Sequence, residues 1–240
     1  MIEIIGLSVR FGGVVSIDDM SVTFPGGTCG LIGPNGAGKT TFFNVLSGFV
    51  TPQAGRVLAF GDDLLALPDF RRARWGLRRT FQTEQAIESL TVFDNVLMVH
   101  EHTSHGGRTA ARDAVLQAVH LTGLGDKRNK AVGGLPASDR RLVEVARAIV
   151  GTPRLILLDE PAAGLPEDET EHLATVIKDI PATVGATVIV VEHDMSLVQA
   201  CCETIAVLDF GRLLASGPTA EVLRDPRVLE AYLGVDESIR

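Results

Sequence analysis

A phosphate-binding loop pattern occupies residues 33–40. The segment reads GPNGAGKT and fits the pattern G-x-x-x-x-G-K-[ST], between an apolar run at residues 29–32 and an amphipathic stretch at residues 41–46. Glycines let the backbone curl so that successive N–H groups point at a phosphate, and the following helix adds the positive end of its dipole. Lys39 can neutralise charge on the β- and γ-phosphates, and Thr40 can offer its hydroxyl to Mg²⁺. The segment therefore predicts binding of a nucleoside triphosphate, with contacts from Asn35, Gly36, Ala37, Gly38, Lys39, Thr40 and Thr41.

Two carboxylates follow an apolar run at residues 155–158. Four consecutive apolar residues are typical of a strand buried on both faces, and the ligands of a parallel sheet collect at the carboxyl ends of its strands. Asp159 can then hold Mg²⁺ through water, and Glu160 can take a proton from the water that attacks the γ-phosphate. A strand that ends in an acidic turn is common, so this motif alone is weak evidence for a catalytic site. The phosphate-binding loop earlier in the chain strengthens that interpretation.

A histidine follows a third apolar run, at residues 187–191. In a parallel sheet His193 would lie on the same edge as Asp159 and Lys39, within reach of the γ-phosphate. A lone histidine is more often structural, but this position favours a contact with phosphate. Gln82 lies where the predicted core meets a helical block, and its amide can coordinate Mg²⁺ or water and report the nucleotide state. The expected catalytic residues are Glu160, His193 and Gln82, and the expected metal ligands are Thr40, Gln82 and Asp159.

Short apolar runs and stretches with helical periodicity predict the strands and helices that must position these groups. The three apolar runs before residue 33 are separated by paired glycines, which is typical of strands and turns. The two later runs flank a helix that begins near Pro166, and this strand-helix-strand order predicts a parallel sheet. Between them and the loop, from about residue 83 to residue 151, the pattern is helical. Thr91 and Asp94 form a capping box there, which predicts the start of a helix.

Bulk composition bounds the class of protein. The 240 residues are 45% hydrophobic, enough to bury a sizeable core in one large α/β domain or in a core with a small subdomain. The formal net charge of −8 argues against a nucleic-acid surface. No apolar run approaches the ~18 residues that span a bilayer, so a membrane role must come through a partner. The three cysteines, Cys29, Cys201 and Cys202, are expected to be reduced and to pack in the interior of a cytoplasmic protein.

The chain resembles the ATP-binding subunits of ABC transporters over nearly its whole length. The resemblance lies in the order and spacing of residues 33–40, Gln82, residues 155–161 and His193. Finer motifs resemble the subunits of branched-chain amino-acid importers. These motifs are Arg10-Phe11-Gly12-Gly13, Arg79-Thr80-Phe81-Gln82, Asp159-Glu160-Pro161-Ala162-Ala163-Gly164-Leu165, Glu192-His193-Asp194-Met195 and Glu230-Ala231-Tyr232-Leu233-Gly234.

The resemblance implies the α/β fold of a P-loop NTPase of the ABC ATPase type. Such a fold has a mostly parallel core sheet, an antiparallel N-terminal β layer and an inserted helical subdomain. Residues 1–82 and 151–240 would form the ATP-binding core with its β layer, and residues 83–150 would form the helical signature subdomain. Residues 83–100 would dock on the coupling helix of a membrane-spanning partner.

The same resemblance implies a role for individual residues. Phe11 would stack on adenine, and Gln82 would be the lid glutamine. Glu160 would be the general base and His193 the γ-phosphate sensor. The implied ligands are ATP and Mg²⁺.

One motif departs from the family pattern. Residues 135–139 read LPASD where the family has its LSGGQ signature, and only the leucine matches. In the family, the signature of one subunit contacts the γ-phosphate held by the other, so that two ATPs are clamped in a head-to-tail dimer. Pro136 offers neither a hydroxyl nor an N–H, and Ser138 replaces a glycine that allows close backbone approach. Ser138 is expected to serve as the N-cap of the next helix and to keep an altered anion site there.

These features together predict an ATPase subunit that energises an importer of branched-chain or related hydrophobic amino acids. Its expected partners are permease subunits that span the membrane, a second ATPase subunit that is the same or different, and, indirectly, a substrate-binding protein. The expected location is the inner face of the cell membrane, through the permease. Two alternatives stay open: an ABC ATPase for urea, for amides or for export, and an ATP-driven interaction module whose hydrolysis is weak because of its divergent signature.

Overall fold

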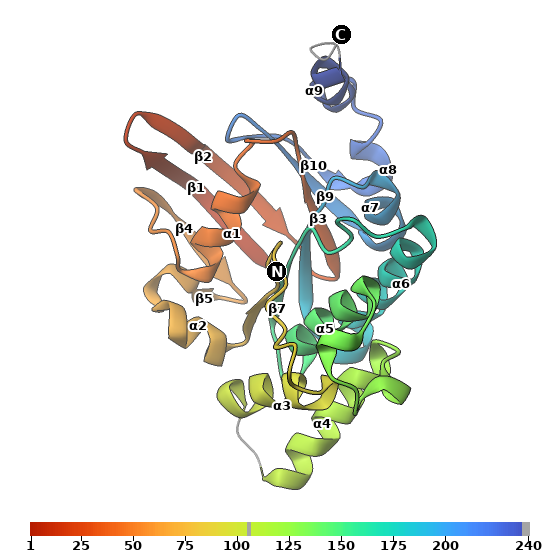
Figure 1. The fold of residues 1–240 in the computed structure, drawn as a ribbon. Coiled ribbons are helices and arrows are strands. Elements are labelled where there is room, and N and C mark those ends of the chain that lie inside the picture. The colour runs from red at the N-terminus through yellow and green to blue at the C-terminus, as the bar shows by residue number, and fades with distance from the viewer. Residues whose placement is uncertain (105–106, 237–240) are drawn as a thin grey trace.

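Two β-sheets and a block of helices make up the computed structural model, which describes residues 1–104 and 107–236 (Figure 1). The first sheet is antiparallel, with strand order β2-β1-β4-β5. Its strands are β1 (Ile2–Phe11), β2 (Val14–Phe24), β4 (Ala54–Ala59) and β5 (Asp62–Asp63). The antiparallel N-terminal layer expected from the sequence is confirmed.

The second sheet is the core sheet, with strand order β10-β9-β3-β8-β7-β6. Its strands are β3 (Thr28–Ile32), β6 (Leu77–Arg79), β7 (Leu155–Asp159), β8 (Thr187–Val191), β9 (Thr204–Asp209) and β10 (Arg212–Pro218). All neighbouring strands are parallel except β9 and β10. The carboxyl ends of β3, β6, β7 and β8 therefore meet at one edge, which confirms the predicted parallel sheet and places the site residues that follow these strands together.

The central strands are buried on both faces, as their continuous apolar runs predict. Along β7, Leu155 and Leu157 pack in one hydrophobic cluster with the antiparallel sheet, while Ile156 and Leu158 pack in the other with the helices. This alternation follows from the two-residue period of a strand. The first cluster also holds Phe42 of α1 (Lys39–Ser47), so the helix after the phosphate-binding loop is anchored between the two sheets.

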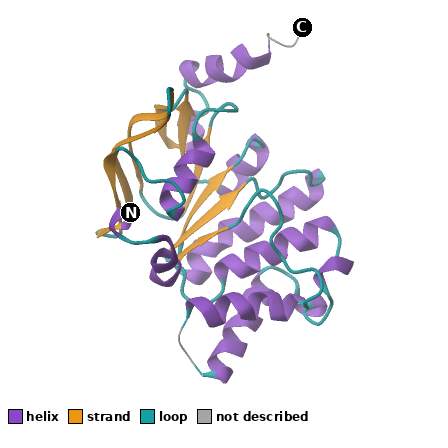
Figure 2. Ribbon diagram, turned by 60° about the vertical axis from the view of Figure 1, so that its left-hand side comes forward, coloured by secondary structure: helices purple, strands orange, loops and turns teal. Residues whose placement is uncertain are grey.

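The helical block lies on the far side of the core sheet from β1 and β2 (Figures 1 and 2). It contains α3 (Val92–Thr103), α4 (Arg108–Leu121) and α5 (Ala137–Ile149), whose buried side chains share one cluster with α6 (Glu167–Val184) and α7 (Met195–Cys201). The backbone N–H of Asp94 donates to the Thr91 hydroxyl at 3.0 Å, which confirms the predicted cap of α3.

The remaining elements are short. They are the helices α2 (Asp69–Trp75), α8 (Thr219–Val222) and α9 (Pro226–Asp236), and the 3₁₀ turns η1 (Leu64–Ala66), η2 (Gly125–Lys127) and η3 (Val132–Gly134). The described helices include none that is both long and apolar enough to cross a bilayer. Cys29, Cys201 and Cys202 are buried and unbridged, in agreement with their expected packing role.

The expectation that Ser138 caps α5 is wrong. The N-cap is Pro136, with φ −57° and ψ 160°, and α5 begins at Ala137. A proline disfavours the helical conformation in the residue before it, and Leu135 is accordingly extended, with φ −92° and ψ 151°. The chain becomes helical directly after Pro136, so Ser138 is already the second helical residue and its side chain makes no cap hydrogen bond.

Candidate functional site

The phosphate-binding loop joins β3 to α1 through two glycines that no other residue could replace without strain. Gly33 has φ +151°, and a Cβ there would lie 2.1 Å from the carbonyl oxygen of Leu208. Gly38, the N-cap of α1, has φ +106°, and a Cβ there would lie 2.5 Å from the carbonyl oxygen of Ser16. The loop is therefore pressed against β9 and β2, which holds its backbone at the start of the helix.

Lys39 is nearly buried at the first position of α1. Its side chain reaches back across the loop, and Nζ donates to the carbonyl oxygens of Gly33 at 2.6 Å and Pro34 at 2.9 Å. Burial lowers the pKa of the Lys39 ammonium, while the nearby carboxylates of Glu160 and Asp159 raise it in part. A buried ammonium with carbonyl partners and acidic neighbours is suited to neutralise an entering phosphate.

A pocket of about 190 Å³ opens over the loop. It is lined by Ser16, Asn35, Gly36, Ala37, Gly38, Lys39, Thr40, Thr41, Glu160 and His193. Every loop residue expected to contact nucleotide is thus in one place with the two residues expected to act on the γ-phosphate. Ser16 was missed by sequence reasoning, and its hydroxyl donates to that of Thr41 at 2.7 Å.

Glu160 is the point at which the three expected catalytic residues meet. Its carboxylate accepts a hydrogen bond from Gln82 Nε2 at 2.8 Å, and its other oxygen lies 3.1 Å from His193 Nε2. Its backbone has φ +48°, a strained value for a residue other than glycine, and its N–H donates to the carbonyl of Val191 at 2.9 Å. The three residues follow the adjacent strands β6, β7 and β8, so the parallel strand order explains their meeting.

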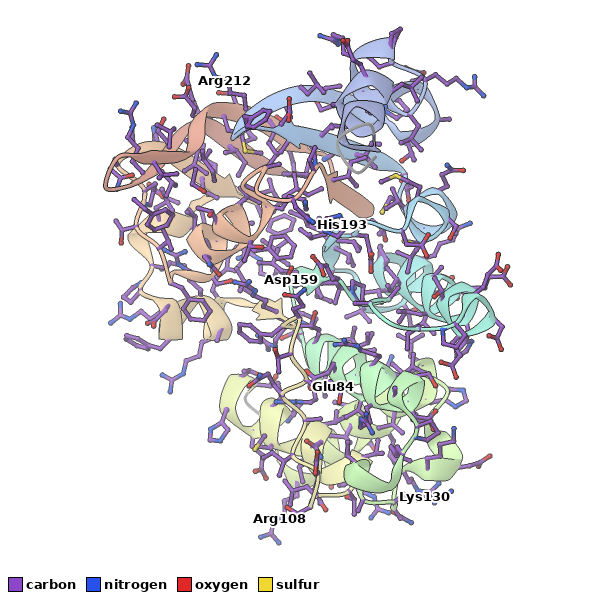
Figure 3. The ribbon with its side chains drawn as sticks, turned by 45° about the horizontal axis from the view of Figure 1, so that its top comes forward. Glu84, Arg108, Lys130, Asp159, His193 and Arg212 are labelled. Carbon is purple, nitrogen blue, oxygen red and sulfur yellow. The ribbon has the colours of Figure 1, made fainter. Side chains whose placement is uncertain are left out.

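Asp159 is tied to a residue that sequence reasoning left without a role. Its Oδ2 accepts a hydrogen bond from Arg79 at 2.8 Å in a buried ion pair. The Arg79 guanidinium also donates to Asn44 and lies over the ring of Phe81, 5.0 Å from its centroid. Arg79 lies at the end of β6, on the sheet edge where the other site residues gather, and this position could have indicated its role from the sequence. Figure 3 marks Asp159 and His193 in the middle of the molecule, between the N-terminal elements and the helices.

The oxygen donors expected to hold Mg²⁺ fit a hard cation. Thr40 lines the pocket and offers an exposed hydroxyl. Gln82 and Asp159 do not line it; they offer an amide oxygen beside Glu160 and a carboxylate paired with Arg79. Carboxylate, hydroxyl and carbonyl oxygens, completed by water, are the ligands that Mg²⁺ prefers.

Two expected nucleotide contacts do not line this pocket. Phe11 ends β1 and is 51% exposed. Ser138 is half-buried in the first turn of α5, next to Asp139, which forms an ion pair with Lys127. Phe11 and Ser138 are thus the two members of the expected set that the structure does not gather around the loop.

Comparison with known proteins identifies the family of this chain. A model of the ABC transporter family matches residues 17–163, and a model of the branched-chain amino acid ATP-binding cassette transporter matches residues 212–238. BraF of Pseudomonas aeruginosa and LivG of Escherichia coli K12, both named high-affinity branched-chain amino acid transport ATP-binding proteins, are each 34% identical over 98% of both chains. LptB of Acidithiobacillus ferridurans, named a lipopolysaccharide export system ATP-binding protein, is 36% identical over 92% of this chain and 91% of its own.

Solved structures agree with this assignment. The ADP conformation of MJ1267, an ATP-binding cassette of an ABC transporter, superposes with a TM-score of 0.86 at 25% identity over 98% of each chain. The dimeric cassette MJ0796 has the same fold, with a TM-score of 0.80 at 22% identity over 91% of this chain and 99% of its own. The fold, the loop pocket and full-length similarity at 34% identity lead to one conclusion: this chain belongs to the ATP-binding subunits of ABC transporters.

Proposed function

We propose that this chain is the ATP-hydrolysing subunit of an importer for branched-chain or related hydrophobic amino acids. The observation that carries the hydrolysis is the pocket in which the phosphate-binding loop meets Glu160 and His193. The match of residues 212–238 to the branched-chain family model, and similarity to BraF and LivG over 98% of the chain, support the class of cargo.

The groups in and beside the pocket each have a task in this hydrolysis. The loop N–H groups and Lys39 neutralise the charge of the β- and γ-phosphates. Glu160 takes the proton from the attacking water, while Gln82 and His193, both within hydrogen-bond distance of it, orient its carboxylate. Thr40, Gln82 and Asp159 would hold Mg²⁺, which when bound supplies further charge neutralisation at the phosphates.

A groove between α3 and α4 is suited to the permease. It has a volume of about 590 Å³, and its lining includes the apolar Phe93 and Leu97, three exposed cations and one carboxylate: Arg108, Arg112, Arg128 and Glu101. An amphipathic helix with acidic residues, contributed by a membrane-spanning partner, would bury its apolar face there and pair with the arginines. In this proposal the chain lies at the inner face of the membrane through the permease, and a substrate-binding protein on the opposite side is an indirect partner.

The proposal predicts ATP-driven uptake in a reconstituted system. Vesicles that hold this chain with its permease, its second ATPase subunit and its binding protein should accumulate labelled leucine when ATP is inside. The same vesicles with Glu160→Gln in this chain should lose most of that uptake, because removal of a general base slows hydrolysis by about 10²–10⁴-fold. Full ATPase activity without uptake of leucine, isoleucine or valine would contradict the proposed cargo, and movement of lipopolysaccharide instead would place the chain with LptB.

The divergent signature bears on the second ATPase. Pro136 and Ser138 stand where the family has a serine and a glycine that contact the partner's γ-phosphate, and the ion pair of Asp139 with Lys127 neutralises the acidic side chain beside them. Loss of one hydrogen bond to a charged phosphate costs about 1.5–3 kcal/mol, or roughly ten- to a hundredfold. This chain would therefore slow hydrolysis at the ATP site of its partner. Its own ATP site would stay active, because its loop, Glu160 and His193 match the family pattern. Such an asymmetry suits a pair of two different ATPase subunits.

We expect this chain and its cognate second ATPase to hydrolyse more ATP together than the sum of their separate rates, measured by phosphate release. The variant Pro136→Ser/Ser138→Gly should raise the rate of the mixture further, by up to about twofold, because it restores a hydrogen bond to phosphate at the slower of the two ATP sites. The same variant measured alone is the matched control. Simple additivity of the two rates would rule out the proposed pairing.

A further inference from the structure

A buried carboxylate lies directly behind the catalytic pocket. Glu192 follows β8 and is only 3% exposed. Its Oε1 accepts a hydrogen bond from the backbone N–H of Ala162 at 2.8 Å. Its Oε2 accepts from the backbone N–H of His193 at 2.9 Å and of Asp194 at 3.3 Å.

The three donors belong to two different segments of the site. Ala162 lies in the turn after Glu160, at the end of β7, whereas His193 and Asp194 open the segment that leads into α7. One side chain thus joins the segment that carries Glu160 to the segment that carries His193. The two segments also meet at the 3.1 Å contact between His193 Nε2 and Glu160 Oε1.

The cost of burying a carboxylate here indicates that its hydrogen-bond donors matter. Burial raises the pKa of Glu192, and the three backbone N–H groups act in the opposite direction. A buried carboxylate can stay ionised when its oxygens accept hydrogen bonds from well-placed donors. The turn that it holds is the strained one, since Glu160 has φ +48°.

We propose that Glu192 is a positioning residue that fixes the Glu160 turn against the His193 segment, and so sets the place of the general base relative to the γ-phosphate. Its carboxylate contacts neither ATP nor water in this role. The inference rests on the proposed function of Glu160 as base. Because Glu192 makes no hydrogen bond with the phosphate-binding loop, which holds most of the expected nucleotide contacts, we expect its replacement to change nucleotide affinity far less than turnover.

The variant Glu192→Gln tests the link with little change in size. An amide has one accepting oxygen, so it cannot accept from Ala162 and from the His193 and Asp194 pair together. In the full chain, amide hydrogen exchange of the peptide that contains Ala162, or of the one that contains His193, should rise by about tenfold, the equivalent of one lost charge-assisted hydrogen bond. Turnover should fall by about a hundredfold, as for a base misplaced by an ångström, with ATP affinity unchanged.

Glu203→Gln is the matched control, because it makes the same chemical change at an exposed carboxylate between α7 and β9 that does not line the pocket, and it should alter none of these values. Thermal unfolding checks that each variant folds. If Glu192→Gln folds poorly, Glu192→Asp keeps the charge and shortens the reach, and it should lower turnover in the same way. Unchanged exchange at both peptides, or a loss of ATP affinity that matches the loss of turnover, would overturn the proposal.

A double-mutant cycle separates positioning of Glu160 from a general loss of structure. In single-turnover experiments on the Glu160→Gln background, adding Glu192→Gln should have little further effect, since the base that it positions is gone. Additive losses would overturn the inference. If Glu160→Gln alone leaves hydrolysis intact, the proposed base fails, whereas a slow Glu160→Gln with a normal Glu192→Gln would remove only the role of Glu192.

Discussion

Glu160→Gln should bind ATP as the native chain does and hydrolyse it about 10²–10⁴-fold more slowly. Glutamine keeps the size of the side chain and one oxygen for the Gln82 amide, which now donates to Glu160 at 2.8 Å. It cannot take a proton from water. Steady-state phosphate release measures the turnover, and calorimetric titration with ATP measures the affinity.

Glu167→Gln is the control for this prediction, because Glu167 is an exposed carboxylate at the start of α6. Size measurement of Glu160→Gln with and without Mg-ATP adds a second readout. A shift to a dimer would mean that residues 135–139 still clamp ATP. A monomer that binds ATP would mean that a different ATPase or the permease is needed. A Glu160→Gln protein with native turnover would contradict the assignment of the base.

Lys39→Ala should greatly lower the affinity of the chain for ATP. Each hydrogen bond from the ammonium to a charged phosphate is worth about 1.5–3 kcal/mol, so loss of contacts to both the β- and the γ-phosphate weakens ATP by roughly 10²–10⁴-fold. The change also removes the donor that joins the carbonyls of Gly33 and Pro34, so the loop loses an internal support. Titration with ATP measures the affinity.

Lys178→Ala, at an exposed lysine on α6, serves as the control for charge. It should leave the affinity for ATP at the native value. Thermal unfolding separates loss of the site from loss of the fold. A folded Lys39→Ala protein with native affinity for ATP would show that phosphate binds elsewhere.

Local patterns predicted the parts of the molecule that depend on near neighbours in the chain. The phosphate-binding loop lies where residues 33–40 predicted it, the apolar runs form β7 and β8, and Thr91 caps α3. The departures are also local in origin. The start of α5 differs from the prediction because Pro136 acts on its immediate neighbour, Leu135.

The sequence by itself determined the loop, the parallel strands and the types of residue at their carboxyl ends. These follow from spacing and apolar period, which each segment carries alone. Only the tertiary structure decided which side chains are paired: Arg79 with Asp159, 80 residues apart, and Glu192 with the N–H of Ala162, 30 residues apart. The physical reason is that such pairs form only after β6, β7 and β8 lie side by side, and no spacing within one segment encodes which donor will face which carboxylate across a sheet edge.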